Sequence, residues 1–154
     1  MAPSPIRLDA AAGGTGGSWY VLLEGLAKLV REVHPWIDLR VVEGGGVINH
    51  ADLGAGRIPV AILNPPMTAA ALAGRPPFER AQPDLRVGVA NLTVNHLQFM
   101  VSREIPIQTL RDWPAHRWPL RVPVDRVGTV DRLVFQLALE DIGLTAAALA
   151  SWGG

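Results

Sequence analysis

The chain of 154 residues contains no cysteine, which excludes disulfide bonds, thiolate catalysis and cysteine-based zinc sites. An excess of charge of one sign is also missing, because Lys+Arg and Asp+Glu number 14 each and the formal net charge is zero. The sequence therefore lacks the basic excess that favours nucleic acid or an anionic membrane surface. No apolar run approaches the length of a membrane-spanning helix. The first five residues show neither the basic nor the apolar region of a signal peptide.

The motifs of several chemistries are absent too. His34, His50 and His116 show no spacing typical of a metal site. No Gly-x-Ser-x-Gly motif supplies a nucleophile, and no Gly-Lys-Ser/Thr follows the glycine-rich stretch as a P-loop requires. The composition, 49% hydrophobic and 18% charged, indicates a folded and core-rich chain. Its length suits one ordinary domain.

Strand-like and helix-like patterns alternate along the first half of the chain. We expect strands at residues 6–10, 37–42 and 58–63, and helices at residues 22–33, 47–53 and 68–73. This order predicts an α/β fold, a parallel sheet with helices on its faces. In such sheets ligands bind beyond the carboxyl ends of the strands. Thr15, Gly45 and Asn64 follow the three strands, so we expect them to form one edge of a binding crevice.

Residues 13–18 are the most distinctive stretch, because four glycines surround Thr15 directly before the first long helix. Glycine lets the backbone approach a ligand closely, and the helix directs its unpaired N–H groups and its dipole to the same place. Such a junction suits an anion. The backbone N–H groups and the hydroxyls of Thr15 and Ser18 suit a carboxylate in particular. The alternative is a tight strand-to-helix turn that binds no ligand.

The second half of the chain has a different pattern. Residues 85–101 alternate over a length too great for one ordinary strand, so we expect a strand that leaves one sheet and enters another. Residues 120–124 predict one more strand, at an edge because it contains a proline. Thr129 is the expected N-cap of a further helix, and Gly143 is its expected end.

With these residues in view, the sequence resembles the TAXI group of TRAP-transporter substrate-binding proteins, which have the type II periplasmic-binding-protein fold. Residues 13–20 look like the group's glycine–threonine–glycine signature followed by two aromatics, and residues 43–49 are similar to its second glycine loop. Residues 60–64 look like its apolar strand that ends in a polar ligand contact. Residues 85–101 look like the interdomain crossing strand, and residues 127–144 like the second-lobe helix whose N-terminus faces the cleft.

The resemblance implies an α/β, type II periplasmic-binding-protein-like fold, with a parallel-sheet lobe plus part of a second lobe. The first lobe would span residues 1–88, a crossing strand or hinge residues 89–101, and the partial second lobe residues 102–154. Family members continue well past this length, so we expect a truncated apolar surface that self-associates or binds a complementary chain. The sequence departs from the family at residues 125–129, which lack a serine, and at Asn64, which two prolines follow.

The candidate ligand-binding residues come from both lobes. They are Thr15, Gly16, Gly17, Ser18, Trp19, Gly45, Gly46, Asn64, His96, Gly128 and Thr129. Simpler roles stay open for several of them. These are core packing for Trp19, a turn for the second glycine loop, N-capping for Thr129 and a structural role for His96.

The resemblance implies a periplasmic solute-binding protein that captures a small organic anion, a dicarboxylate or an acidic amino acid. Its partners would be the membrane components of a TRAP transporter, and it would need no catalytic residue, cofactor, metal or nucleic acid. A nucleotide- or dinucleotide-binding enzyme domain is the alternative, since Glu43 ends the second strand as a ribose-binding acid would. Against it, Trp19 stands where the dinucleotide fingerprint requires its third glycine. A fragment without ligand affinity is the third hypothesis.

Overall fold

A computed structural model describes residues 3–124 and 126–153. The chain divides into two compact units. Unit 1 comprises Met1–Arg86 with Gly128–Val130, and unit 2 comprises Val87–Val127 with Asp131–Gly154. The lobe boundaries expected from the sequence stay a prediction. Asp125, in the loop that lacks the family's serine, lies outside the described residues.

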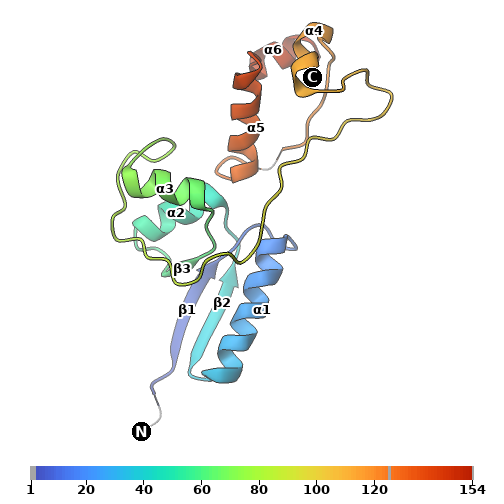
Figure 1. The fold of residues 1–154 in the computed structure, drawn as a ribbon. Helices are drawn as coiled ribbons and strands as arrows, with labels where there is room; N and C mark the ends of the chain where they lie inside the picture. The colour runs from blue at the N-terminus through green and yellow to red at the C-terminus, as the bar shows by residue number, and fades with distance from the viewer. Residues whose placement is uncertain (1–2, 125, 154) are drawn as a thin grey trace. The chain divides into compact units, whose positions relative to one another are not determined.

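Unit 1 contains a parallel sheet of three strands in the order β2-β1-β3. The strands are β1 (Ile6–Ala11), β2 (Ile37–Val42) and β3 (Val60–Ala61). Helix α1 (Ser18–Val33) joins the first two strands and lies alongside β2 (Figure 1). The predicted α/β class and parallel sheet are therefore confirmed. The third strand is shorter than expected, although the ladder continues in a hydrogen bond of 2.9 Å from Ile62 N to Ala11 O.

Alternation along β1 and β2 gives the sheet one apolar and one charged face. Ala10 belongs to a core cluster with Ala12, Leu23 and Ile62, and α1 covers this cluster through Leu23. On the other face Arg7 is in register with Asp38, and Asp9 is in register with Arg40. Both pairs are hydrogen-bonded. Arg7 Nε lies 3.0 Å from Asp38 Oδ2, and Arg40 Nε lies 2.7 Å from Asp9 Oδ1.

These exposed ion pairs also change the acidity of both carboxyls. The hydrogen bond from Arg40 holds the pKa of Asp9 below its usual value, and the hydrogen bond from Arg7 does the same for the pKa of Asp38. Exposed pairs of this kind contribute little stability. Their effect is on register, because a slip by one residue would turn every charge toward the apolar face.

Helix α1 buries only part of its apolar surface. Leu23 and Ala27 are buried, whereas Leu29 is 59% and Val33 is 67% exposed. Leu22 and Leu26 pack against the core cluster, and Leu29 and Val33 lie seven residues after them on the same side of the helix. Helix α1 therefore loses its cover toward its C-terminal end, at Val33.

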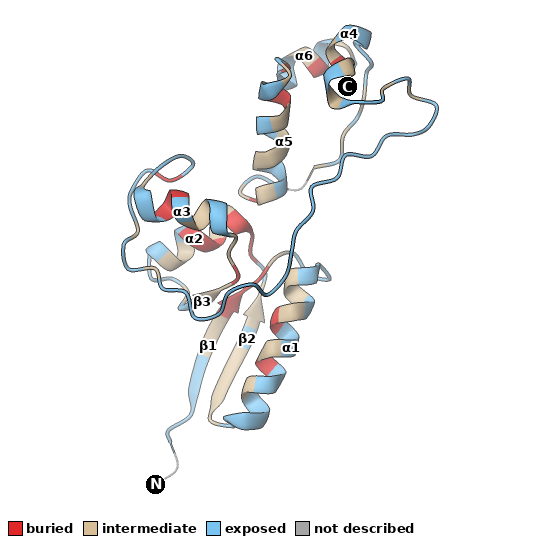
Figure 2. Cartoon of the chain, viewed as in Figure 1, coloured by how far each residue is buried: buried red, intermediate tan, exposed pale blue. Residues whose placement is uncertain are grey.

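Helices α2 (Gly46–Gly54) and α3 (Pro65–Ala73) complete the regular structure of unit 1. Ala70, Ala71 and Phe78 form a second buried cluster there. Figure 2 shows the buried part of α3 and the carboxyl end of β1 in red. Two prolines occupy the first turn of α3. The N–H groups of a first turn have no acceptor within the helix, so the prolines cost α3 no hydrogen bond. The proline pair that departs from the family pattern therefore begins a helix.

Unit 2 is helical in its described part. It contains the 3-10 turn Leu110–Asp112 and helices α4 (Trp113–His116), α5 (Val130–Asp141, whose first residue belongs to unit 1) and α6 (Ala146–Ser151). Trp113, Leu139, Leu144 and Leu149 form its buried cluster. The indole Nε1 of Trp113 donates to Trp118 O at 2.9 Å, which satisfies the polar atom of this buried ring.

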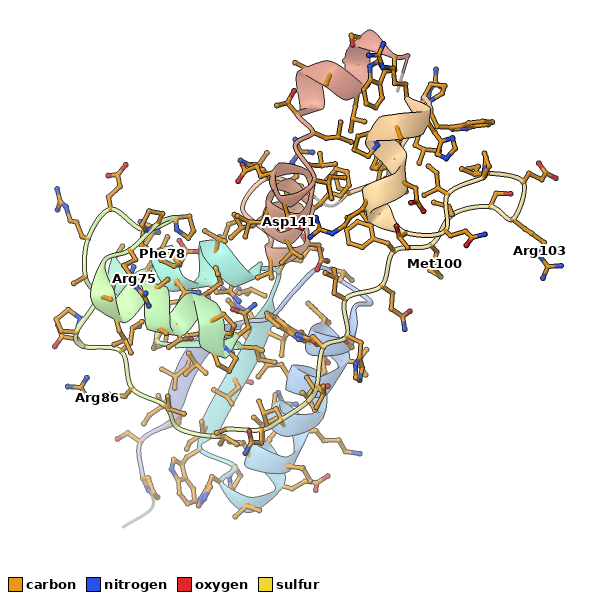
Figure 3. The ribbon with its side chains drawn as sticks, turned by 45° about the horizontal axis from the view of Figure 1, so that its top comes forward. Arg75, Phe78, Arg86, Met100, Arg103 and Asp141 are labelled. Atoms are coloured by element: carbon orange, nitrogen blue, oxygen red, sulfur yellow. The ribbon has the colours of Figure 1, made fainter. Side chains whose placement is uncertain are left out.

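The predicted crossing strand at residues 85–101 is not formed, and neither is the predicted strand at residues 120–124. Every residue from 86 to 104 is exposed, which Figure 2 shows as an uninterrupted pale-blue segment. The side chains of Arg86 and Arg103 project away from this segment (Figure 3). A strand is completed by a ladder partner, and the described residues supply a partner strand only to β1, β2 and β3. Alternation alone therefore did not produce a strand here.

His50 is the buried titratable group of α2. Its Nδ1 contacts Gly46 O, its Nε2 lies 3.0 Å from Thr68 Oγ1, and its ring centre is 5.2 Å from that of Phe78. A carbonyl oxygen only accepts, so Nδ1 carries the proton of the neutral ring. Burial lowers the pKa of His50, and the contact with Gly46 O opposes this in part. Folding therefore favours the neutral form of His50.

We expect unit 1 to lose stability as the pH falls below about 6.5, the ordinary pKa of histidine. In that range the His50 side chain binds a proton more readily in the unfolded chain than in the folded one. The free energy of unfolding therefore decreases with falling pH. Urea unfolding at pH 7.5 and 5.5 should show a lower free energy of unfolding at pH 5.5, and His50→Gln should remove this difference. The exposed His96→Gln is the control and should keep the loss. Equal losses in wild type and His50→Gln would contradict the assignment.

Candidate functional site

The three predicted loops meet at the carboxyl edge of the sheet in unit 1. Because the strands are parallel, Thr15 after β1, Gly45 after β2 and Asn64 after β3 all follow the same edge. Ala12 N donates to Val42 O at 3.0 Å, and Gly44 N donates to Gly13 O at 3.2 Å. The backbone hydrogen bonding between β1 and β2 therefore continues into the loops that follow the two strands.

The buried amide of Asn49 in α2 connects all three loops. Its Nδ2 donates to Ala12 O at 2.8 Å and to Ile62 O at 2.9 Å, and its Oδ1 accepts from Gly45 N at 2.9 Å. Asn49 is 0% exposed, so each of these bonds replaces a lost contact with water. Asn49 lies in the second glycine loop predicted at residues 43–49, but it was not among the candidate ligand-binding residues. A polar side chain one turn after three glycines was the available signal.

Thr15 binds a carboxylate of the chain itself. Thr15 N donates to Glu43 Oε1 at 3.0 Å, and Thr15 Oγ1 donates to the same oxygen at 2.5 Å. A backbone N–H and a hydroxyl that converge on one anionic oxygen make strong, charge-assisted hydrogen bonds. Glu43, which the sequence analysis placed in the second glycine loop and considered as a ribose-binding acid, thus connects that loop to the first one.

The N-terminus of α1 has no side-chain cap. Its N-cap is Gly17, and its first turn contains no acidic residue. Gly16 has a φ of +81°, a conformation that favours glycine, and Gly17 N donates to Gly14 O at 3.0 Å. Ser18 begins the helix and is exposed, whereas Trp19 packs against the core cluster of the sheet. The amides of the first turn therefore keep the capacity to hold an acceptor.

The second glycine loop is buried against residues 128–130, which belong to the same unit. Gly128 O accepts from Val47 N and Ile48 N, each at 3.2 Å, so it takes up two amides at the start of α2. A Cβ on Gly45 would lie 3.2 Å from Thr129 Cγ2. Glycine at position 45 therefore lets the loop pack closely against Thr129, which is buried.

The remaining candidates lie in different settings. Asn64 Oδ1 accepts from Met67 N at 3.2 Å, so this oxygen caps α3. His96 belongs to unit 2 and lies in the exposed segment without regular structure. Unit 1 thus contains every candidate residue except His96. Whether these residues contact a ligand stays a prediction.

A groove of about 740 Å³ lies elsewhere in unit 1, between α1 and β2. Its lining includes Arg7, Lys28, Arg31 and Arg40, and none of the candidate residues. Arg7 and Arg31 both contact Asp38 at 3.0 Å, so their charges are partly compensated. Among the described residues, no group of three His, Cys, Asp or Glu side chains is placed to hold a metal ion. The described helices also include none of sufficient length and apolarity to cross a membrane.

We expect Gly44→Ala to destabilise unit 1 by about 1–3 kcal/mol, the usual cost of overpacking. The new Cβ would lie 2.0 Å from Asn49 Oδ1 and 2.9 Å from Ala12 O, so the amide would have to leave its three loops. Gly14→Ala is the matched control, because a Cβ there meets no atom within 4 Å of the described structure. Urea unfolding of both variants is the measurement. Equal midpoints for the two variants would refute the role given to Asn49.

Comparison with protein-family models gives a match to the NMT1-like family over residues 10–119. The matched range contains both glycine loops, Asn64 and His96, and ends before Gly128. No curated protein and no solved structure matches the chain. Since the matched range is well over half of the 154 residues, the chain belongs to the NMT1-like family, a periplasmic solute-binding family related to the binding proteins of ABC and TRAP transporters.

Proposed function

We propose that this protein binds a small solute that carries a carboxylate, either a dicarboxylate or an acidic amino acid. The NMT1-like family suggests an extracytoplasmic solute-binding role and is typically non-enzymatic. The more specific proposal is a periplasmic, TAXI-like protein that passes its solute to the membrane components of a TRAP-type transporter. The glycine-loop signature at residues 13–20 supports this assignment.

One observation carries the choice of solute. The N–H and the hydroxyl of Thr15 both donate to a carboxylate oxygen of Glu43. The donors of the glycine loop are therefore oriented for a carboxylate, and the uncapped start of α1 adds the favourable end of a helix dipole. The dinucleotide alternative is disfavoured because Trp19 packs into the core cluster where that motif requires a glycine.

We expect succinate or glutamate to bind in calorimetry, and NAD to give no heat. Thr15→Val removes one of the two donors and should weaken binding about tenfold, the usual effect of losing a hydrogen bond to a charged group. Thr93→Val, at an exposed position outside unit 1, is the matched control and should leave the affinity unchanged. Binding of NAD would refute the proposal in favour of the dinucleotide alternative. No heat with any of the three compounds would favour the ligand-free fragment.

We also propose that the protein self-associates through residues 87–101. Eight large apolar side chains of this segment are exposed: Val87, Val89, Leu92, Val94, Leu97, Phe99, Met100 and Val101. Met100 is 86% exposed (labelled in Figure 3). An alternating apolar segment without a ladder partner is a typical site of pairing between chains.

Light scattering after size exclusion should therefore give a mass above the 16.5 kDa of one chain. Val94→Lys with Met100→Lys should reduce that mass, because charges on the segment oppose pairing. Val127→Lys is the control, since Val127 is 79% exposed but lies outside the segment. A monomeric wild type, or an oligomer that Val127→Lys disrupts equally well, would argue against this interface.

A further inference from the structure

We infer that two copies of the chain pair through the open edge of β2, as antiparallel strands related by a two-fold axis at Leu39. Within the described residues, β2 is an outer strand of the sheet and pairs with β1 alone. An outer strand presents a row of backbone N–H and C=O groups that another chain can bind. The inference goes beyond the proposed function, because it involves neither the candidate solute-binding residues nor residues 87–101.

The backbone of β2 turns the polar groups of Leu39 toward the open edge. Ala12 N donates to Val42 O at 3.0 Å, so the even-numbered residues of β2 direct their backbone groups to β1. These groups alternate between the two edges of a strand, and the odd-numbered residues therefore direct theirs outward. In an antiparallel pair, two opposite residues of this kind exchange both hydrogen bonds. Leu39 of each copy can thus donate its N–H to the backbone oxygen of Leu39 in the other.

The groove of about 740 Å³ between α1 and β2 follows this edge. Residues 38–41 line the groove. Consecutive side chains of a strand point to opposite faces, so a groove lined by all four lies along the edge. Arg31 of α1 spans the groove to reach Asp38 at 3.0 Å, and the Arg31 side chain is 59% exposed. Exposed ion pairs are weak, so Asp38 can exchange Arg31 for a cation of a second copy.

Charge complementarity selects a second copy as the partner. With the axis at Leu39, Asp38 of each copy lies opposite Arg40 of the other. Within one chain Asp38 is in register with Arg7, and Arg40 is in register with Asp9. A row of alternating charge therefore crosses four strands, from Arg7 and Asp38 of one copy to Arg40 and Asp9 of the other. Opposite charges that face each other across two strands stabilise the pair.

The same side chains exclude the neighbouring registers. An axis at Asp38 would place this carboxylate opposite its own copy, and an axis at Arg40 would do the same with the guanidinium. Like charges directly opposite each other are destabilising. The axis at Leu39 also places Ile37 opposite Val41 on the other face, so apolar side chains meet there. Charges of one sign would protect an edge from pairing, whereas this edge matches itself in one register.

Cysteine substitution tests the register, because the chain contains no cysteine of its own. Leu39→Cys should give a disulfide-linked dimer on mild oxidation, since the Cα atoms of such a pair lie about 5.5 Å apart, within the range of a disulfide. Ile37→Cys and Val41→Cys should cross-link when the two proteins are mixed, and neither should do so alone. Glu79→Cys, at an exposed position of unit 1 outside β2, is the control and should stay unlinked on a non-reducing gel.

Two results of the cross-linking would overturn the inference. One is a Glu79→Cys protein that links as readily as Leu39→Cys, because the links would then come from random collision. The other is a mixture of Ile37→Cys and Val41→Cys that links no more than each protein alone, because these positions face each other only in the inferred register.

Light scattering separates this contact from the one proposed at residues 87–101. The protein with Val94→Lys and Met100→Lys should keep twice the 16.5 kDa mass of one chain, and a further Leu39→Pro should reduce it to one chain. Proline at position 39 removes an N–H that points to the open edge, and it leaves the hydrogen bonds between β1 and β2 in place. Urea unfolding of the Leu39→Pro protein checks that it is folded, and the cross-linking does not depend on this variant.

The failures of the two contacts are distinguishable. A single-chain mass with Val94→Lys and Met100→Lys alone would overturn pairing through β2 and leave the contact at residues 87–101 standing. A dimer that persists in folded Leu39→Pro would overturn pairing through β2 as well. A wild-type dimer that Leu39→Pro dissociates, and that the two lysines leave intact, would support β2 and contradict the other contact.

Discussion

The buried amide of Asn49 is the interaction on which the architecture of the candidate site depends. Three strands end at one edge of the sheet, and each leaves backbone groups that no further strand pairs. The Asn49 side chain donates to Ala12 O and Ile62 O and accepts from Gly45 N. Leaving such buried groups unpaired would cost more than the bonds themselves contribute, so the loops are held in one arrangement. That arrangement requires glycine at position 44, where a side chain would occupy the space of the amide.

The carboxylates of unit 1 lie in two different settings. Asp9 and Asp38 pair with arginines in register across β1 and β2, where they help define which face of the sheet is apolar. Glu43 lies one residue beyond β2 and binds Thr15 instead. Arginine side chains pair with the first two carboxylates, and Thr15 donates its backbone N–H and its hydroxyl to Glu43.

The sequence predicted the fold best where the pattern was local. The alternation in residues 6–10 and 37–42 correctly predicted two strands, and the long helix ends at Val33 as expected. The same alternation in residues 85–101 misled, because pairing with a distant strand decides whether such a segment becomes part of a sheet. The helix expected at residues 22–33 was formed, but Leu29 and Val33 are exposed near its C-terminal end.

By itself the sequence determined the α/β class, the glycine loops at the strand ends and the absence of disulfide bonds, since it contains no cysteine. These follow from residue types and their spacing, which need no knowledge of distant contacts. Only the tertiary structure decided which groups in those loops are already used. Asn49 and Glu43 are polar residues of ordinary appearance in the chain, and their importance arises from partners 37 and 28 positions away. Hydrogen bonds over such separations depend on how parallel strands bring their ends together, and no local pattern encodes them.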